Sequence, residues 1–159
     1  MQRKKLAILL ILGIIILSCN NSNKVDRIIH YIQSIDSRKD LTESVTEFET
    51  LDKNDKEISG FSIYELTDND GVLHRLIADV AHPNELPGIY EFYYKNDTLT
   101  FARIMQFDEL GIDTIIDSDY YFDRMKLIKK FNRKRDDLDS EIVLQASEFY
   151  LIYGNLSTE

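Results

Sequence analysis

The turns between the apolar segments of this 159-residue chain are too short for any sheet except an antiparallel one. From residue 44 to residue 131, β-branched and aromatic runs alternate with a few polar turn residues, for example at 68–71 and 95–97. A parallel strand pair needs a crossover of roughly a dozen residues, and these turns leave no room for one. The sequence therefore predicts a meander of about five to seven antiparallel strands. The candidate strands lie at 45–51, 58–66, 72–80, 88–95, 98–107, 114–122 and 125–131.

Segments with helical spacing of apolar residues flank the predicted sheet on both sides. The first covers residues 24–37 and the second covers residues 138–153. Asp137 or Asp139 is expected to cap the second helix, and Gly154 is expected to end it. These elements form one domain, residues 24–159, because a chain of this length supplies a single core. The predicted fold class is α+β, with an N-terminal and a C-terminal helix packed on the sheet.

Residues 1–18 have the order of a secretory signal. Arg3, Lys4 and Lys5 form a basic head, and residues 6–17 carry no polar side chain. A helix of that length rises about 18 Å, which is less than the roughly 30 Å of hydrocarbon in a bilayer. A cleaved signal peptide is therefore the favoured interpretation.

The end of this signal, Ile16-Leu17-Ser18-Cys19, resembles the lipobox of bacterial lipoproteins. The resemblance implies that Cys19 becomes the mature N-terminus and carries acyl chains that anchor the protein in a membrane. Residues 19–23 then form the lipidated cysteine and a short polar tether. Position 20 is Asn rather than Asp, which favours the outer membrane, with the domain facing the periplasm. A plain signal peptide or a short uncleaved anchor is the alternative.

Removal of the signal makes the chain more acidic. The whole chain has 19 basic and 28 acidic side chains, and the signal holds three of the basic ones. The mature chain thus has 16 basic against 28 acidic side chains, a formal charge of −12. Nucleic-acid phosphates repel such a domain, so no nucleic-acid partner is expected. The expected contacts are the membrane, through the lipid on Cys19, and an envelope protein.

No arrangement of residues in the sequence indicates catalysis. His30, His74 and His82 lack the spacing that would present two ligands to one metal. A Gly-x-Ser-x-Gly elbow and a phosphate-binding glycine loop are both missing from the sequence. We therefore expect no metal, no cofactor and no catalytic residue. An enzyme with an unrecognised site is the alternative.

Two further patterns lie near the end of the predicted sheet. Six basic residues fall between Lys126 and Arg135, and four acidic residues follow by Glu141. This run fits a contact for anionic headgroups or an acidic partner, but a solvated loop is the favoured interpretation. In addition, segments 93–99 and 121–127 share two aromatic residues, four others and a leucine at an offset of 28, which predicts two similar hairpins.

Tyrosines are the strongest candidates for binding. Odd-numbered and even-numbered residues of the strand 88–95 face opposite sides of the sheet. If the even-numbered residues pack in the core, the opposite side of the sheet displays Tyr93. Either Tyr120 or Tyr121 of a later strand is expected to join it on that side. Exposed tyrosines with a polar rim suit a protein-binding surface, and we predict these three as binding residues. The alternative is that helices cover both faces.

Two threonines are candidates for modification. Thr98 and Thr114 each lie between an aspartate and an aliphatic residue. These triplets resemble the acceptor for O-glycosylation of exported proteins in some Gram-negative lineages.

Together these features predict a lipid-anchored cell-envelope protein with a binding or structural role and no catalytic activity. The mature domain resembles small envelope lipoproteins of unknown function, a likeness that implies no activity. Two other functions stay open. An inhibitor or immunity lipoprotein would use the acidic domain to block a basic enzyme. A carrier of a hydrophobic ligand would need a cavity between the sheet and a helix.

Overall fold

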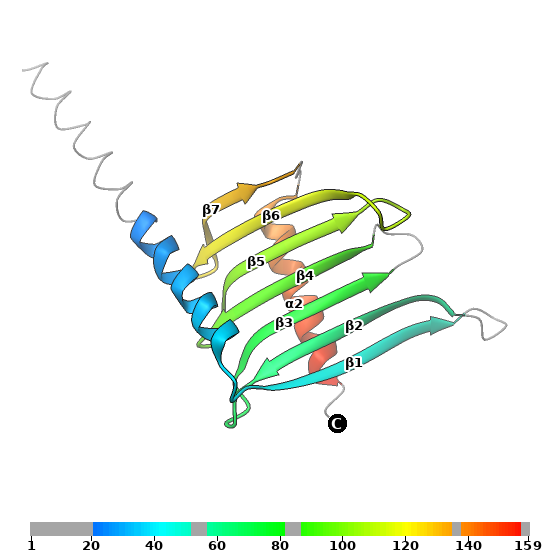
Figure 1. Cartoon of the computed structure of the whole chain (residues 1–159), viewed down its shortest axis with the longest axis horizontal. Coiled ribbons are helices and arrows are strands. Elements are labelled where there is room, and N and C mark those ends of the chain that lie inside the picture. The colour runs from blue at the N-terminus through cyan, green and yellow to red at the C-terminus, as the bar shows by residue number, and fades with distance from the viewer. Residues whose placement is uncertain (1–20, 52–56, 82–86, 135–137, 157–159) are drawn as a thin grey trace, which may run out of the picture.

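One antiparallel sheet organises the molecule (Figure 1). The computed structural model describes residues 21–51, 57–81, 87–134 and 138–156. Seven strands lie side by side in the order in which they occur in the chain. They are β1 (Thr42–Leu51), β2 (Glu57–Thr67), β3 (Leu73–Ala81), β4 (Gly88–Lys95), β5 (Thr98–Phe107), β6 (Thr114–Asp123) and β7 (Lys126–Asn132). All neighbouring pairs are antiparallel, so the predicted meander is confirmed.

The two predicted helices lie against opposite faces of this sheet, and the α+β fold class is confirmed. The N-terminal helix, residues 21–37, crosses one end of the sheet, whereas α2 (Ser140–Leu156) lies across the other face (Figure 1). The backbone N–H of Glu141 donates to Asp139 Oδ1 at 3.2 Å, so Asp139 caps α2 as predicted. Among the described residues, no helix is long and apolar enough to span a bilayer.

The end of α2 differs from the prediction. The helix continues to Leu156, and Gly154 therefore lies inside its last turns. A Cβ at Gly154 would overlap the carboxylate of Glu65 on β2. Close packing against the sheet, rather than a left-handed turn, explains the glycine at this position. Asp137, the other predicted cap, lies outside the described residues.

The N-terminal end also differs in one detail. Residues 21–23, expected as part of a tether, already belong to the helix, and the Arg27 side chain donates to the Asn23 carbonyl at 3.2 Å. This contact occupies a backbone carbonyl of the first described turn. Residues 1–18 and Cys19, the predicted signal and lipidation site, lie outside the described residues.

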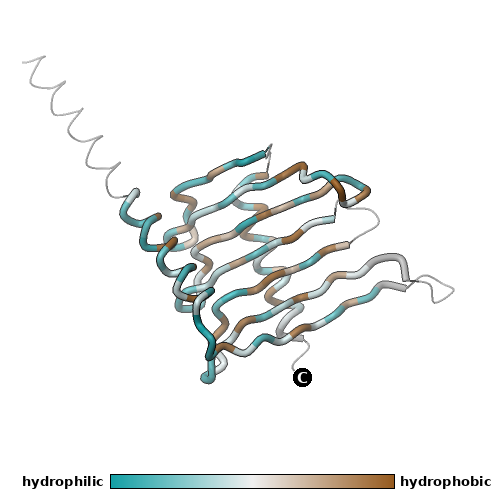
Figure 2. The backbone as a smooth tube through the Cα atoms, in the orientation of Figure 1, coloured by the Kyte–Doolittle hydropathy of each residue, from teal (hydrophilic) through white to brown (hydrophobic). Residues whose placement is uncertain are grey.

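The main core lies between the sheet and α2. Strand alternation sends every second side chain to this face, and Figure 2 shows the resulting exchange of hydrophobic and hydrophilic positions along the strands. Tyr153 of α2 meets Phe48 and Phe61 edge-on, with ring centroids 5.4 and 5.6 Å apart. The buried residues of this core are Ile63, Leu76, Ala78, Val80, Phe92, Tyr94, Leu99, Ala102, Ile104, Tyr120, Phe122, Val143 and Tyr150.

A smaller core lies under the N-terminal helix. Its buried residues are Val25, Ile35, Tyr93, Phe101 and Tyr121. Phe101 is central, with ring centroids 5.7 Å from Tyr93 and 5.2 Å from Tyr121. Among the described residues, this helix is the one that lies on this face, and it covers only one end of it (Figure 1).

The two similar segments form the same hairpin twice. Both have two central residues with positive φ, namely Asn96 (51°) and Asp97 (56°) in one, and Arg124 (51°) and Met125 (62°) in the other. Both also shift register between their two aromatic residues. Asn and Asp adopt the left-handed region readily, whereas Arg and Met adopt it at a cost. The second hairpin therefore holds its turn with residues that the turn itself does not favour.

Candidate functional site

The three tyrosines predicted to bind a partner are buried. Tyr93, Tyr120 and Tyr121 expose 2%, 0% and 9% of their surfaces. The Tyr120 hydroxyl donates to the Leu138 carbonyl at 3.3 Å on the α2 side, while Tyr93 and Tyr121 lie under the N-terminal helix. The prediction that these rings are exposed is wrong, because a helix covers each face of the sheet where they lie.

Tyr93 and Tyr121 line a cavity of about 290 Å³ between the N-terminal helix and the sheet. The Tyr93 hydroxyl lies 2.7 Å from Asp36 Oδ1 and 3.0 Å from Glu91 Oε1. Arg75 Nη1 lies 3.3 Å from the same Asp36 oxygen. Burial, and then the Glu91 carboxylate, raise the pKa of Tyr93. The phenol stays protonated, and these polar groups satisfy one another across the cavity.

A second polar network lies on the face of the sheet that carries the N-terminal helix, next to the part that this helix covers. Asp119 is 3% exposed, and it accepts hydrogen bonds from Arg103 Nε at 2.8 Å and from Arg133 Nη2 at 2.6 Å. Arg133 Nη1 also lies 3.0 Å from Asp117 Oδ1. Burial alone would raise the pKa of Asp119, but the hydrogen bonds from the two arginines hold it below its ordinary value. This network joins β5, β6 and the segment after β7.

A diagonal of apolar side chains crosses the part of this face that no helix of the described residues covers. We call these residues the open face: Val45, Tyr64, Ile77, Ile89 and Met105. Val45 pairs with Tyr64, and Tyr64 pairs with Ile77, while Ile89 lies opposite Met105 on the next strand pair. Val45 is 49% exposed, the other four are half-buried, and none belongs to either core. One side of the diagonal is bordered by Glu47, Ser62 and Asp79.

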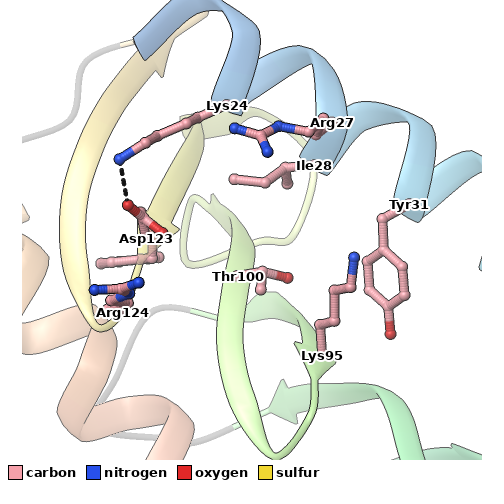
Figure 3. A pocket seen from close by; sticks show the side chains of 9 residues that line it. Lys24, Arg27, Ile28, Tyr31, Lys95, Thr100, Asp123 and Arg124 are labelled. Atoms are coloured by element: carbon pink, nitrogen blue, oxygen red, sulfur yellow. Dashed lines mark hydrogen bonds and ion pairs between the residues drawn. The ribbon is translucent and has the colours of Figure 1, made fainter. Parts of the chain in front are cut away.

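A separate hollow of about 200 Å³ lies where the N-terminal helix meets the β6–β7 turn (Figure 3). We call it the basic pocket, and its charged lining is Lys24, Arg27, Lys95, Asp123 and Arg124. Lys24 Nζ lies 2.5 Å from Asp123 Oδ2. Lys95 Nζ lies 5.2 Å from the centroid of the Tyr31 ring. The hydrogen bond from Lys24 holds the pKa of Asp123 below its ordinary value.

A third cavity, of about 540 Å³, lies between the sheet and α2. Its lining includes Glu65, Leu73, Tyr94 and Leu151. Burial raises the pKa of Glu65. Its apolar residues lie beside the carboxyl groups of Glu65 and Asp97, and a carrier of a hydrophobic ligand would need a space of this kind.

The histidines do not form a metal site in the described part of the chain, where no group of three suitable ligands occurs. His74 Nε2 lies 3.0 Å from Asp68 Oδ2, and His74 Nδ1 lies 3.2 Å from the Tyr31 hydroxyl. This chain of contacts ties the N-terminal helix to the β2–β3 turn. His30 is exposed, with Nδ1 2.7 Å from the carbonyl of its own helix at Asp26, and His82 lies outside the described residues.

The first part of the basic run near the end of the sheet, Lys126–Asn132, forms the edge strand β7 and is not a loop. Lys130 Nζ donates to the Leu138 carbonyl at 2.8 Å, and Lys134 Nζ donates to the Thr114 carbonyl at 2.6 Å. Lys126 and Lys129 are exposed. Lysines on an edge strand discourage pairing with a second sheet, which gives this run a structural role. Arg135 lies outside the described residues.

The basic pocket was missed by the sequence analysis. Its cations come from a helix and from two hairpins that lie far apart in the chain, so no single window contains them. Two signals were present. Lys24 and Arg27 lie one helical turn apart, and Lys95 and Asp123 occupy corresponding positions of the two similar segments. Only the placement of the helix against the hairpins brings these side chains together.

The two candidate glycosylation sites lie at the beginnings of strands. Thr98 is half-buried and its hydroxyl donates to the Asn96 carbonyl at 3.2 Å. Thr114 is also half-buried, at the first position of β6. Their modification stays a prediction.

Among the described residues, the polar groups around Tyr93 and Asp119 are paired by internal contacts. No protein-family model, no curated protein and no solved structure shows significant similarity to this chain.

Proposed function

We propose that this chain is a lipid-anchored cell-envelope protein whose α+β domain binds a protein partner and catalyses no reaction. Cys19, at the end of the signal-like segment, carries the lipid, and the mature domain faces the periplasm from the outer membrane. The N-terminal helix already includes residue 21, so the domain begins within a few residues of the anchor. Such a connection keeps the domain at the membrane surface and raises its local concentration there.

The observation that carries the binding role is the open face. Among the described residues, α2 lies across one face of the seven-stranded sheet, and the N-terminal helix covers only one end of the other face. Its diagonal of Val45, Tyr64, Ile77, Ile89 and Met105 offers apolar contact area on rigid strands, and polar residues border it. An apolar centre with a polar rim is the usual anatomy of a protein interface.

The chemistry of the described residues supports the absence of catalysis. The carboxylate of Asp119 is held by two arginines, and the Tyr93 phenol is held by two carboxylates. Catalytic groups need a pKa close to the working pH and access to a substrate. The pKa of Asp119 lies below its ordinary value and the pKa of Tyr93 lies above it, so both pKa values are shifted away from neutral pH. Asp119 therefore stays ionised and Tyr93 stays protonated.

One alternative has an observation in its favour. An inhibitor of a basic enzyme needs exposed carboxylates beside an apolar contact surface, and Glu47 and Asp79 stand beside the open face. In this alternative the same face binds, and the partner is an incoming enzyme rather than a resident envelope protein.

The anchor is tested on the full chain produced in a bacterial host. Mass spectrometry of the N-terminal peptide is expected to show diacylglyceryl-modified Cys19 as the first residue. Cys19→Ser should move the protein from the membrane fraction to the soluble fraction, whereas the exposed control Ser22→Ala should leave it in the membrane. An unmodified Cys19 in the mature protein would contradict the proposal.

The binding role is tested by a photo-crosslinking amino acid placed at position 77 of the lipidated protein in native envelopes. Position 152, on the solvent side of α2 and 60% exposed in the native side chain, is the matched control. A discrete protein adduct is expected from position 77 only. Asp79→Lys should reduce that adduct, because it reverses charge at the border. Identical adducts from both positions would refute a specific open face.

A further inference from the structure

The basic pocket concentrates positive charge in an acidic domain. Among the described residues that line it, four are cations, Lys24, Arg27, Lys95 and Arg124, and one is a carboxylate, Asp123, so this lining has an excess of three positive charges. The mature chain carries 16 basic against 28 acidic side chains, so random placement would favour carboxylates in any hollow. Charges farther away than about 10 Å are screened by salt, and the local excess therefore decides what enters the pocket.

Internal contacts use only part of this charge. Lys24 pairs with Asp123, and Arg27 donates through Nε to the Asn23 carbonyl. Within residues 21–156, as far as they are described, no contact uses the two terminal nitrogens of the Arg27 guanidinium. Within the described part of the chain, the Arg124 side chain makes no hydrogen bond or ion pair. Arginine donors of this kind suit a phosphate group, because the planar fork matches two of its oxygens.

The turn that presents Arg124 indicates a role beyond closing a hairpin. The β4–β5 hairpin makes the same turn with Asn96 and Asp97, residue types that tolerate positive φ. The β6–β7 hairpin places Arg124 and Met125 there instead, and residues held in a disfavoured conformation cluster at functional sites. Met125 is 40% exposed.

Apolar and basic side chains alternate at this tip. Leu127 is 39% exposed, and it follows Lys126, which is also exposed. A tip with exposed Met and Leu beside Arg and Lys matches the boundary between headgroups and acyl chains of a membrane.

The basic pocket lies close to the N-terminal end of the described domain. Lys24 and Arg27 lie at the N-terminal end of the described helix (Figure 1), and they follow Cys19 by five and eight residues in the sequence. The ion pair between Lys24 and Asp123 holds the β6–β7 tip beside that end (Figure 3). A membrane anchor attached there would bring lipid headgroups to the mouth of the pocket.

We propose that the basic pocket binds the phosphate of an anionic phospholipid headgroup in the membrane that holds the protein's own anchor. The Arg27 and Arg124 guanidiniums contact the phosphate oxygens, Lys95 adds a third cation, and Met125 and Leu127 insert at the level of the upper acyl chains. This contact fixes the orientation of the domain, so that the open face stands away from the bilayer. The proposal rests on the proposed lipid anchor for its membrane, but not for its ligand chemistry.

The test measures binding of the mature chain with Cys19→Ser to lipid vesicles by sedimentation. All of the described contacts lie within residues 21–156, so this chain keeps the whole domain. One set of vesicles contains phosphatidylcholine alone, and the other contains phosphatidylcholine with phosphatidylglycerol. Inorganic phosphate alone is titrated in parallel. Without a lipid on residue 19, any attachment must come from the domain itself.

Three variants separate the contribution of the Arg124 charge from that of a cation outside the pocket. Arg124→Gly removes the cation and suits the positive φ, so the melting temperature should stay the same or rise while binding weakens about fivefold. Arg124→Lys keeps the charge and should bind within about twofold of the wild type. Lys39→Ala removes an exposed cation at the other end of the helix and should leave binding unchanged.

The expected result is binding to the phosphatidylglycerol vesicles only. Equal binding to both kinds of vesicle, or an Arg124→Gly variant that binds as the wild type does, would overturn the proposal. Binding of inorganic phosphate as tight as that of the vesicles would replace the lipid with a free ion. Mass spectrometry of Cys19 decides the proposed anchor separately, since this chain carries no lipid in any arm of the experiment.

Discussion

The two faces of the sheet are built from the same alternating strands and have opposite characters. Toward α2, a continuous apolar core includes Phe92, which is fully buried between strands and helix. Toward the N-terminal helix, a small apolar cluster around Phe101 is followed by the ion pairs of buried Asp119 with two partly exposed arginines, and then by the open face. The comparison separates the face that stabilises the fold from the face that is available for binding.

The difference has a simple physical source. On the α2 face, aromatic and aliphatic side chains from the strands interleave with rings from the helix. On the other face, arginines and carboxylates from neighbouring strands lie opposite one another, as Arg103 does with Asp119. Polar groups of this kind need partners but no apolar cover, so a second large helix is not required there.

The largest effect should come from Phe92→Ala. Loss of this ring from the closed core is expected to lower the free energy of unfolding by about 3–5 kcal/mol. Ile89→Ala on the same strand is the matched control, because Ile89 belongs to the open face, and it should cost less than about 1 kcal/mol. Urea denaturation followed by circular dichroism measures both values. Equal losses of unfolding free energy in the two variants would mean that the α2 face does not stabilise the fold more than the open face does.

Asp119→Asn should have the next largest effect. The change leaves Arg103 and Arg133 without their shared carboxylate, and we expect a loss of about 2–3 kcal/mol. This value is below that of a fully buried pair, because the arginine side chains are 35% and 37% exposed.

Acid should reproduce this loss in the wild type. The folded-state pKa of Asp119 lies below its ordinary value, so its stabilisation is complete above about pH 4 and is lost as the pH falls through the folded-state pKa. Stability curves of the wild type and Asp119→Asn should therefore converge in acid. Parallel curves from neutral to acidic pH would assign the stability to other groups.

Tyr31→Phe should have a smaller effect, confined to the half-covered face. The Tyr31 hydroxyl donates to the Tyr94 carbonyl and lies beside His74, which fastens the N-terminal helix to the sheet. The expected cost is about 1 kcal/mol. Hydrogen exchange should show faster opening of residues 21–37 with little change in α2, and Tyr64→Phe on the open face should leave both unchanged. Uniform acceleration of exchange in both helices would contradict this attachment.

The smallest effect concerns Glu65, which lines the α2-side cavity. Burial raises the pKa of Glu65, so its ionised form is disfavoured in the folded state at neutral pH. Glu65→Gln should raise stability by a few tenths of a kcal/mol at pH 7, after allowance for solvent screening. The gain should vanish below about pH 4, where the wild-type carboxyl is protonated in both states. Thermal unfolding at both pH values tests this, with the exposed Glu47→Gln as control.

The strands were predictable because their signals are local. The expected strand at 58–66 is β2 (Glu57–Thr67), and the expected strand at 98–107 is β5 (Thr98–Phe107), since period-two alternation and turn residues lie within single short windows. The offset of 28 residues likewise predicted two similar hairpins, and both have the same turn and register shift.

The binding surfaces were not predictable in the same way. Alternation showed that Tyr93 and its even-numbered neighbours face opposite sides, but the exposure of each face depends on where two distant helices pack. Those helices bury Tyr93, Tyr120 and Tyr121. The open face and the basic pocket arise from register across several strands and from one helix position, which no short segment of sequence specifies.

The sequential order of the strands has a consequence for folding. Each strand pairs with the one synthesised just before it, so the contacts are close in sequence and the sheet is able to form progressively from β1 to β7. The α2 face, however, closes only when the last helix arrives. Until then a broad apolar surface is open to aggregation and proteases. Chains that stop before residue 140 should therefore be degraded rather than accumulate as a partly active domain.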